Sequence, residues 1–247
     1  MTDTASSLKD RVFLVTGAGQ GLGRATARAL GRRGATVILL GRTVSKLEKV
    51  YDAIVADGGP QPAIFPMDLA AAGDADFEAM AQAIGYQMGR LDGIVHCAAA
   101  FDTLRPQPLD SVEEWLRLFR VNAAAPAAIN RACAPLLEAA EKAPVILVGE
   151  THGQAPAAYW GGFAVSKAAL EAYFKVQADE WSDKPVNLIL VIPGPANTPQ
   201  RQKSHPGEDK TLLPQAEDLA EKLVLLMGGD GDEWRGKRVE LKDVGAA

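Results

Sequence analysis

Short runs of β-branched and aliphatic residues alternate along this chain with longer stretches whose apolar residues recur at helical spacing. Runs such as 11–16 (RVFLVT) and 36–40 (TVILL) have the length and composition of buried strands. Strands that alternate with helices are typical of βαβ units, which build a parallel sheet with helices on both faces. The alternation therefore predicts an α/β fold with a doubly wound, all-parallel sheet.

The pattern is regular enough to place each element. Strands are predicted at 11–16, 36–40, 63–65, 93–97, 145–148, 186–191 and 238–241. Helices are predicted at 21–33, 47–54, 74–88, 112–139, 163–181 and 214–227. Pro126 should bend the long helix that contains it, and the polar stretch 197–213 is predicted to be a loop. No linker interrupts the pattern, so residues 1–247 are predicted to form one Rossmann-type domain of seven strands.

Charge and composition exclude several classes of function. The chain has 26 Lys and Arg against 31 Asp and Glu, so its net charge of −5 does not suit a general nucleic-acid binder. Cys97 and Cys133 lack a metal-type spacing, and the three histidines are scattered, so we expect no metal site. No apolar run is long enough to span a membrane, and residues 1–10 lack a signal core. We therefore expect a cytoplasmic protein.

A glycine-rich turn follows the first predicted strand. It places Gly17, Gly19, Gly21 and Gly23 directly before the first predicted helix. Glycines in this position let the backbone approach a pyrophosphate, and the following helix N-terminus offers free N–H groups to the negative charge. The turn, with Gln20 and Leu22, is therefore predicted to bind a dinucleotide; a glycine turn without a ligand is the alternative.

The second predicted strand ends in Leu40-Gly41-Arg42-Thr43. A site for NAD(H) usually carries a carboxylate near this point, which binds the ribose 2′-hydroxyl. Here the side chain is the guanidinium of Arg42, which can pair with a 2′-phosphate. The sequence therefore favours NADP(H) over NAD(H). The alternatives are that Arg42 is a surface cation and that no dinucleotide binds.

The T-G-x-x-x-G-x-G spacing of residues 16–23, together with the strand pattern and length, resembles the short-chain dehydrogenase/reductase family. The resemblance covers nearly the whole chain and implies an oligomeric, nicotinamide-dependent oxidoreductase. It implies that Thr198 meets the nicotinamide carboxamide and that Asp68 lies on the adenine side. The remaining matches to the family's cofactor site are Leu69, Ala98, Lys167, Pro193 and Gly194.

The family's catalytic tetrad of Asn, Ser, Tyr and Lys is only half present. The resemblance implies that Tyr exchanges the proton, Lys lowers the pKa of Tyr, Ser holds the substrate oxygen and Asn keeps a water relay in place. Asn122 and Lys167 match, but Phe163 stands at the Tyr position and Glu150 at the Ser position. Phenylalanine has no proton to give, and loss of a positioned acid or base lowers rates roughly 10²–10⁴-fold.

Several interpretations of these replacements remain open. A carboxylate at position 150 would repel a developing oxyanion, although Glu150 could pair with Lys167. Alternatively, Glu150 or Tyr159, one helical turn before Phe163, could act as the acid or base. A simpler view is that Phe163 is a core residue and that Tyr159 only packs.

Three functional hypotheses follow. The first is an NADP(H)-binding protein that is impaired or silent in dehydrogenase chemistry. The second is an NADP(H)-dependent oxidoreductase that uses Glu150 or Tyr159 on an unidentified carbonyl or alcohol substrate. The third, compatible with the first, is a partner subunit in a homo- or hetero-oligomer, with a homodimer or homotetramer favoured. The resemblance implies association through the two longest helices, 112–139 and 163–181.

Overall fold

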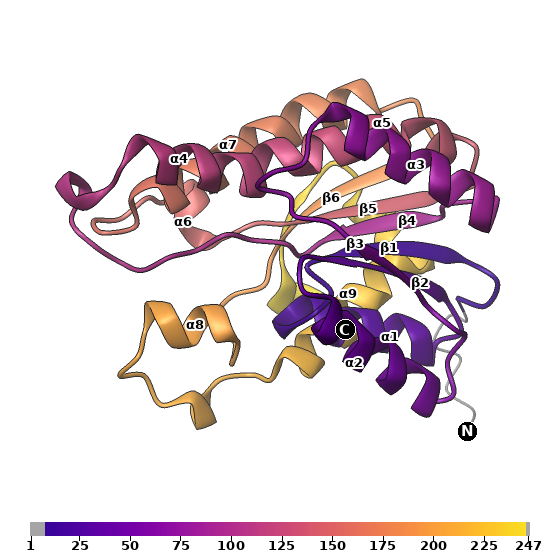
Figure 1. Ribbon diagram of the computed structural model, residues 1–247, viewed down its shortest axis with the longest axis horizontal. Coiled ribbons are helices and arrows are strands. Elements are labelled where there is room, and N and C mark those ends of the chain that lie inside the picture. Colours follow the sequence, from indigo (N-terminus) through magenta and orange to yellow (C-terminus); the bar gives the residue numbers. More distant parts are fainter. Residues whose placement is uncertain (1–7, 246–247) are drawn as a thin grey trace.

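The computed structural model describes residues 8–245 and contains a seven-stranded parallel sheet. The strand order is β3-β2-β1-β4-β5-β6-β7 (Figure 1). The predicted doubly wound α/β sheet is confirmed. Residues 1–7, 246 and 247 lie outside the described part. Most of residues 1–10, which were predicted to lack a signal core, therefore also lies outside it. The strands are β1 Val12–Thr16, β2 Thr36–Gly41, β3 Ala63–Pro66, β4 Gly93–His96, β5 Ala143–Val148, β6 Val186–Ile192 and β7 Arg238–Glu240.

Helices cover both faces of the sheet (Figure 1). On one face lie α1 (Gly21–Arg32), α2 (Val44–Ala56) and α9 (Ala216–Met227), and on the other α3 (Asp74–Met88), α4 (Val112–Phe119), α5 (Ala125–Glu138) and α7 (Gly161–Glu180). Along β1, Phe13 and Val15 pack into the first core, whereas Leu14 packs into the second. A strand buried on both faces must be apolar throughout, which is why these strands read as continuous apolar runs.

The predicted helix 112–139 is interrupted, and this corrects the sequence-based expectation of one bent helix. A π-helical segment, Arg120–Ala124, separates α4 from α5. Pro126 has no N–H, so it cannot donate to the carbonyl of Asn122 as an α-helix would require. The wider turn therefore falls just before Pro126, and Asn122 lies within it.

Residues 197–213 are also more ordered than the predicted loop. They contain the short helix α8 (Pro199–Ser204) and a 3₁₀ turn, Lys210–Leu212. Thr198 caps α8 by accepting a hydrogen bond from the N–H of Arg201, and proline occupies its first turn. The sequence pattern also missed the four-residue helix α6 (Thr151–Gln154) and the 3₁₀ turns Gln107–Leu109, Gly229–Trp234 and Leu241–Asp243.

The strand order reverses direction at β1 and β4. The chain leaves β1 toward β2 on one side and leaves β4 toward β5 on the other. In open parallel sheets a crevice forms outside the carboxyl ends of the strands at such a point, and ligands bind there. Within residues 8–245, no helix is both long and apolar enough to cross a membrane.

Candidate functional site: a cleft at the carboxyl edge of the sheet

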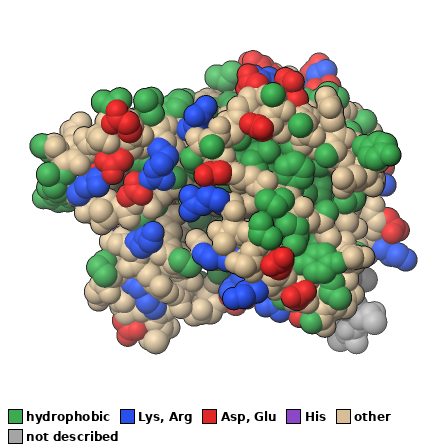
Figure 2. All heavy atoms as spheres, viewed as in Figure 1, with side chains coloured by type: hydrophobic (Ala, Val, Ile, Leu, Met, Phe, Trp, Pro, Cys, Tyr) green, Lys and Arg blue, Asp and Glu red, His purple; other side chains and the backbone are tan. Residues whose placement is uncertain are grey.

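A cleft of about 580 Å³ opens at this reversal point. Turns that follow β1, β2, β3, β4, β5 and β6 line it, together with α8. Lysine and arginine side chains surround the hollow in Figure 2. Six cationic side chains line the cleft against three carboxylates, although the whole chain is acidic. The cations are Arg42, Lys46, Arg117, Lys167, Arg201 and Lys203, and the carboxylates are Asp68, Asp102 and Glu150. An anionic ligand is therefore favoured.

The structure brings the sequence-predicted cofactor residues together in this cleft. They come from the turns after five strands, the first turn of α1 and the helix α7, and every one of them contributes to the wall of the cleft. They are Gly17, Gly19, Gln20, Gly21, Leu22, Gly23, Arg42, Asp68, Leu69, Ala98, Lys167, Pro193, Gly194 and Thr198. Their sequence separation is large, so only the parallel sheet places them at one edge.

Gly17 lets the turns after β1 and β4 touch. Its φ is +67°, and a Cβ built on it would lie 2.8 Å from the Cα of Ala98. A Cβ on Gly23 would lie 2.4 Å from the carbonyl oxygen of Gly17. Larger residues cannot occupy either position without moving the backbone. The glycines thus hold the N-terminus of α1 close to the cleft.

Two cations mark the end of the cleft beyond β2. Arg42 is exposed at the end of this strand, and Lys46 lies in the first turn of α2. The Lys46 ammonium donates to Gln20 Oε1 at 2.6 Å, which ties α2 to the glycine turn. The sequence analysis missed Lys46, although its place four residues after Arg42, just before the predicted helix 47–54, is a usable signal.

Asn122 does not reach the cleft wall but supports it from behind. Its Oδ1 accepts a hydrogen bond from the N–H of Ala100 at 2.7 Å, and its Nδ2 donates to the carbonyl of Ala100 at 2.9 Å. The same Nδ2 donates to Ser166 Oγ at 2.9 Å. Asn122 therefore fixes the turn after β4 against α7.

Lys167 is buried at the floor of the cleft, with 4% of its surface exposed. Its ammonium donates to the carbonyl of Val148 at 2.8 Å. Burial lowers the pKa of this amine to about 8, and the carboxylate of Glu150 opposes that shift. No ion pair joins Glu150 to Lys167 within the described residues, so the structure does not support the alternative in which these two groups pair.

Phe163 is buried, with 3% of its surface exposed, and it faces an aromatic cluster. Its ring makes an edge contact with Phe101 at 5.0 Å between centroids and lies 5.8 Å from Trp160. The Lys167 ammonium lies 5.9 Å from the centre of the Phe163 ring. The Phe163 ring therefore stands beside the lysine and carries no hydroxyl.

Glu150 caps the short helix α6. Its Oε1 accepts a hydrogen bond from the N–H of Thr151 at 3.1 Å and lies 3.4 Å from Nδ1 of His152. About a quarter of each side chain, Glu150 and His152, is exposed. Thr151 and His152 therefore orient this carboxylate. Because Glu150 also lines the cleft, as Lys167 does, its carboxylate remains accessible to a ligand.

Tyr159 lies outside the cleft, which argues against its predicted role as acid or base. Its side chain is 61% exposed, and its φ is +74°. It lines a separate small hollow beside Asp110. The backbone carbonyl of Tyr159 accepts a hydrogen bond from the N–H of Arg105 at 3.2 Å. The phenol would need the segment around it to move before it could replace the missing hydroxyl.

Two further residues near the cleft have structural explanations. Burial raises the pKa of the Cys97 thiol to about 12, so it is protonated and a poor nucleophile at neutral pH. His96 is buried, and its Nε2 lies 2.9 Å from Asn130 Oδ1. Neither residue forms an activated catalytic pair with a neighbour.

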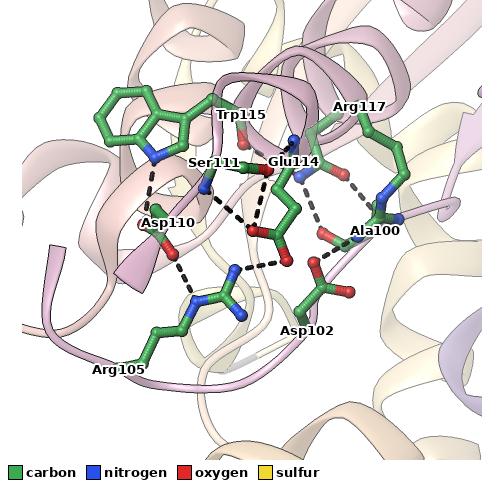
Figure 3. Close-up of polar contacts among 10 residues, drawn as sticks. Ala100, Asp102, Arg105, Asp110, Ser111, Glu114, Trp115 and Arg117 are labelled. Carbon is green, nitrogen blue, oxygen red and sulfur yellow. Dashed lines mark hydrogen bonds and ion pairs between the residues drawn. The ribbon is translucent and has the colours of Figure 1, made fainter. Parts of the chain in front are cut away.

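A network of polar contacts holds the wall of the cleft that follows β4 (Figure 3). Arg105 donates to Asp110 Oδ1 at 2.5 Å and pairs with Glu114 Oε1 at 2.6 Å. The indole N–H of Trp115 donates to Asp110 Oδ2 at 3.1 Å. Arg117 pairs with Asp102 at the rim of the cleft. The network joins the segment 100–111 to the start of α4.

Comparison with known proteins agrees with this geometry. The family model for short chain dehydrogenases matches residues 11–209. The uncharacterized oxidoreductase YciK of Escherichia coli K12 is 34% identical over 223 residues, which is 90% of this chain and 88% of YciK.

Two solved structures are similar over nearly their whole length. One is a short chain dehydrogenase of Shigella flexneri complexed with NADP (TM-score 0.93, 32% identity, 97% of this chain and all of that one). The other is a short chain dehydrogenase of E. coli CFT073 complexed with NADPH (TM-score 0.93, 33% identity, 97% of this chain and 99% of that one).

Proposed function

The chain belongs to the short chain dehydrogenase family, and on that premise we propose that it binds NADP(H) in the cleft while its tyrosine-dependent chemistry is impaired or silent. The observation that carries the proposal is Phe163, which sits buried beside Lys167 where the family's phenol would stand. The dinucleotide supplies a hydride when bound, but the ring of Phe163 has no proton to exchange with a substrate oxygen.

The residues of the cleft fit the dinucleotide. Gly17 and Gly19 line the cleft beside the N-terminus of α1, whose free N–H groups would bind a pyrophosphate. The missing Cβ atoms let this turn pack against Ala98 and Lys46. Arg42 and Lys46 would bind a 2′-phosphate, and no carboxylate stands at the end of β2 to bind a free 2′-hydroxyl. The NADP and NADPH complexes of the two similar structures support the same choice.

A fluorescence titration with NADPH and, separately, with NADH tests the cofactor. We expect NADPH to bind more tightly, because only its 2′-phosphate can pair with Arg42 and Lys46. Arg42→Ala and Lys46→Ala should each weaken NADPH roughly tenfold and leave NADH nearly unchanged. Lys49→Ala is the matched control, since Lys49 is exposed on α2 but does not line the cleft. Binding of neither dinucleotide would refute the proposal.

Restoring the tetrad tests the chemistry. In the double variant Phe163→Tyr with Glu150→Ser, a phenol regains its place beside Lys167, and the repelling carboxylate is removed. We expect a gain of NADPH-dependent reduction of benzaldehyde or cyclohexanone over the unmodified chain. Turnover by the unmodified chain at the ordinary rate of roughly 1–10³ s⁻¹ would contradict the proposal.

Self-association and a cytoplasmic location are part of the same proposal. Helices α4 and α7 carry exposed apolar side chains, among them Leu116, Phe119 and Val165. Such a surface suits a homodimer or tetramer. Light scattering of the purified protein tests the association.

A further inference from the structure

His152 is a titratable group in the cleft that the family's tetrad does not contain. It lies two residues after Glu150 on the helix α6, and it lines the cleft together with Lys167. Its side chain is 23% exposed, so it is anchored but reachable. An imidazole ordinarily titrates between pH 5 and 8, which makes it the commonest acid and base in enzymes.

Stacking fixes the plane of the His152 ring. The imidazole lies on the indole of Trp160, with 3.8 Å between ring centroids and 18° between planes. Trp160 is itself buried at 8% exposure and packs against Phe163 and Phe101. The aromatic cluster around Phe163 thus serves as a platform for the imidazole.

Glu150 makes the two nitrogens of the His152 ring unequal, because it contacts only Nδ1. Its Oε1 lies 3.4 Å from Nδ1 of His152 and is held in place by the N–H of Thr151. A carboxylate at one ring nitrogen keeps a proton there and leaves the other nitrogen to exchange protons. Within residues 8–245, no group is hydrogen-bonded to Nε2 of His152.

We infer that His152, oriented by Glu150 and Trp160, exchanges a proton with the substrate oxygen in this cleft and sustains slow turnover. The inference rests on the proposed function, because it requires NADP(H) in the cleft and no phenol at Phe163. In the reducing direction, bound NADPH would supply a hydride, with its electron pair, to the carbonyl carbon and would be left as NADP⁺. The oxygen takes a proton from Nε2 of the imidazolium, which yields an alcohol, and one proton taken up from the solvent restores the imidazolium.

The charges around His152 are consistent with this step. A bare carboxylate at position 150 would repel a developing oxyanion. A protonated imidazole beside it neutralises the charge of that carboxylate and offers its Nε2–H as a hydrogen-bond donor to the oxyanion. The other charged groups near the ring are the ammonium of Lys167, His205 across Trp160 and the guanidinium of Arg201, which pairs with Glu208.

The experiment compares His152→Gln and Glu150→Gln with the unmodified chain, all at full length and loaded with NADPH. His205→Gln is the matched control, because His205 also lies near Trp160 but does not line the cleft. The substrates are benzaldehyde, cyclohexanone and pyruvate. We expect His152→Gln to lower kcat about 10²–10⁴-fold with little change in the Kd for NADPH, and to remove the fall of kcat at high pH. His205→Gln should change kcat less than about twofold.

Nitrogen-15 NMR of histidine-labelled protein supplies a readout besides turnover. We expect the neutral His152 ring to carry its proton on Nδ1, and Glu150→Gln to shift that tautomer. Unchanged kcat in His152→Gln, a proton on Nε2 in the neutral ring, or no turnover by the unmodified chain would each overturn the inference. The NADPH titration separates these results from failure of the proposed function, since they leave NADPH binding intact.

Discussion

His96, at the end of β4, links burial to the pH dependence of stability. Burial lowers its pKa to about 4, and the hydrogen bond with Asn130 opposes that shift only in part. In the unfolded chain a histidine protonates near pH 6.5. Between pH 6.5 and 4 the unfolded chain therefore takes up a proton that the folded chain refuses, and the free energy of unfolding falls as the pH falls.

We expect His96→Gln to remove this loss while keeping an amide near Asn130. The unmodified chain should lose on the order of 3 kcal/mol more than the variant between pH 7 and pH 4. Urea denaturation at both pH values measures the difference. Equal losses in the two proteins would show that His96 does not titrate as its burial requires.

At the scale of single elements, the polar network of Figure 3 holds the segment that follows β4. Ser111 caps α4, because its Oγ accepts a hydrogen bond from the N–H of Glu114 at 3.2 Å. In turn, Oε2 of Glu114 accepts a hydrogen bond from the N–H of Ser111 at 3.0 Å. Arg105 and Ser111 together lower the pKa of Glu114 to about 2, so the network persists in mild acid. It places Phe101 against Trp160 and Phe163.

Replacement of Arg105 should therefore loosen residues 100–111 as a unit. Arg105→Met keeps the length of the side chain but removes its contacts with Asp110 and Glu114. We expect faster amide hydrogen exchange in this segment and unchanged exchange in β1 and α1. Lys142→Met, which removes an exposed ion pair with Asp232 elsewhere, is the control. Unchanged exchange in Arg105→Met would mean that the segment is held by packing alone.

For the whole molecule, the proposed self-association would use the apolar surface of α4 and α7. Val112, Leu116, Phe119, Val165 and Val176 are each between 47% and 69% exposed. Water contact with such a surface is unfavourable, and burial against a second copy removes it. Hydrophobic side chains are visible at the end of the molecule that carries α4 (Figure 2).

We expect Leu116→Glu to shift the protein to monomers in light scattering. The charge would have to be buried in the interface, which is unfavourable without a partner. Leu212→Glu is the matched control, because Leu212 is 81% exposed on a distant 3₁₀ turn. A monomeric unmodified chain, or a Leu116→Glu variant that still associates, would exclude this surface as the interface.

The sequence by itself determined the sheet and the glycine turn. Strand and helix periodicities are local properties, and the spacing of residues 16–23 is local as well, so both can be recognised without tertiary contacts. The π-helical segment was missed because Pro126 signals a break but not its kind. The helix α8 was missed because a proline followed by five polar residues shows no apolar period.

Only the tertiary structure decided which partners the site residues have. Glu150 and Lys167 looked like a pair, yet Lys167 donates to Val148 and Glu150 contacts His152. The stacking of His152 on Trp160 was equally hidden. These contacts depend on how the turn after β5 packs against the start of α7. Side-chain partners across such a junction follow from distances of a few ångströms, which residue spacing does not encode.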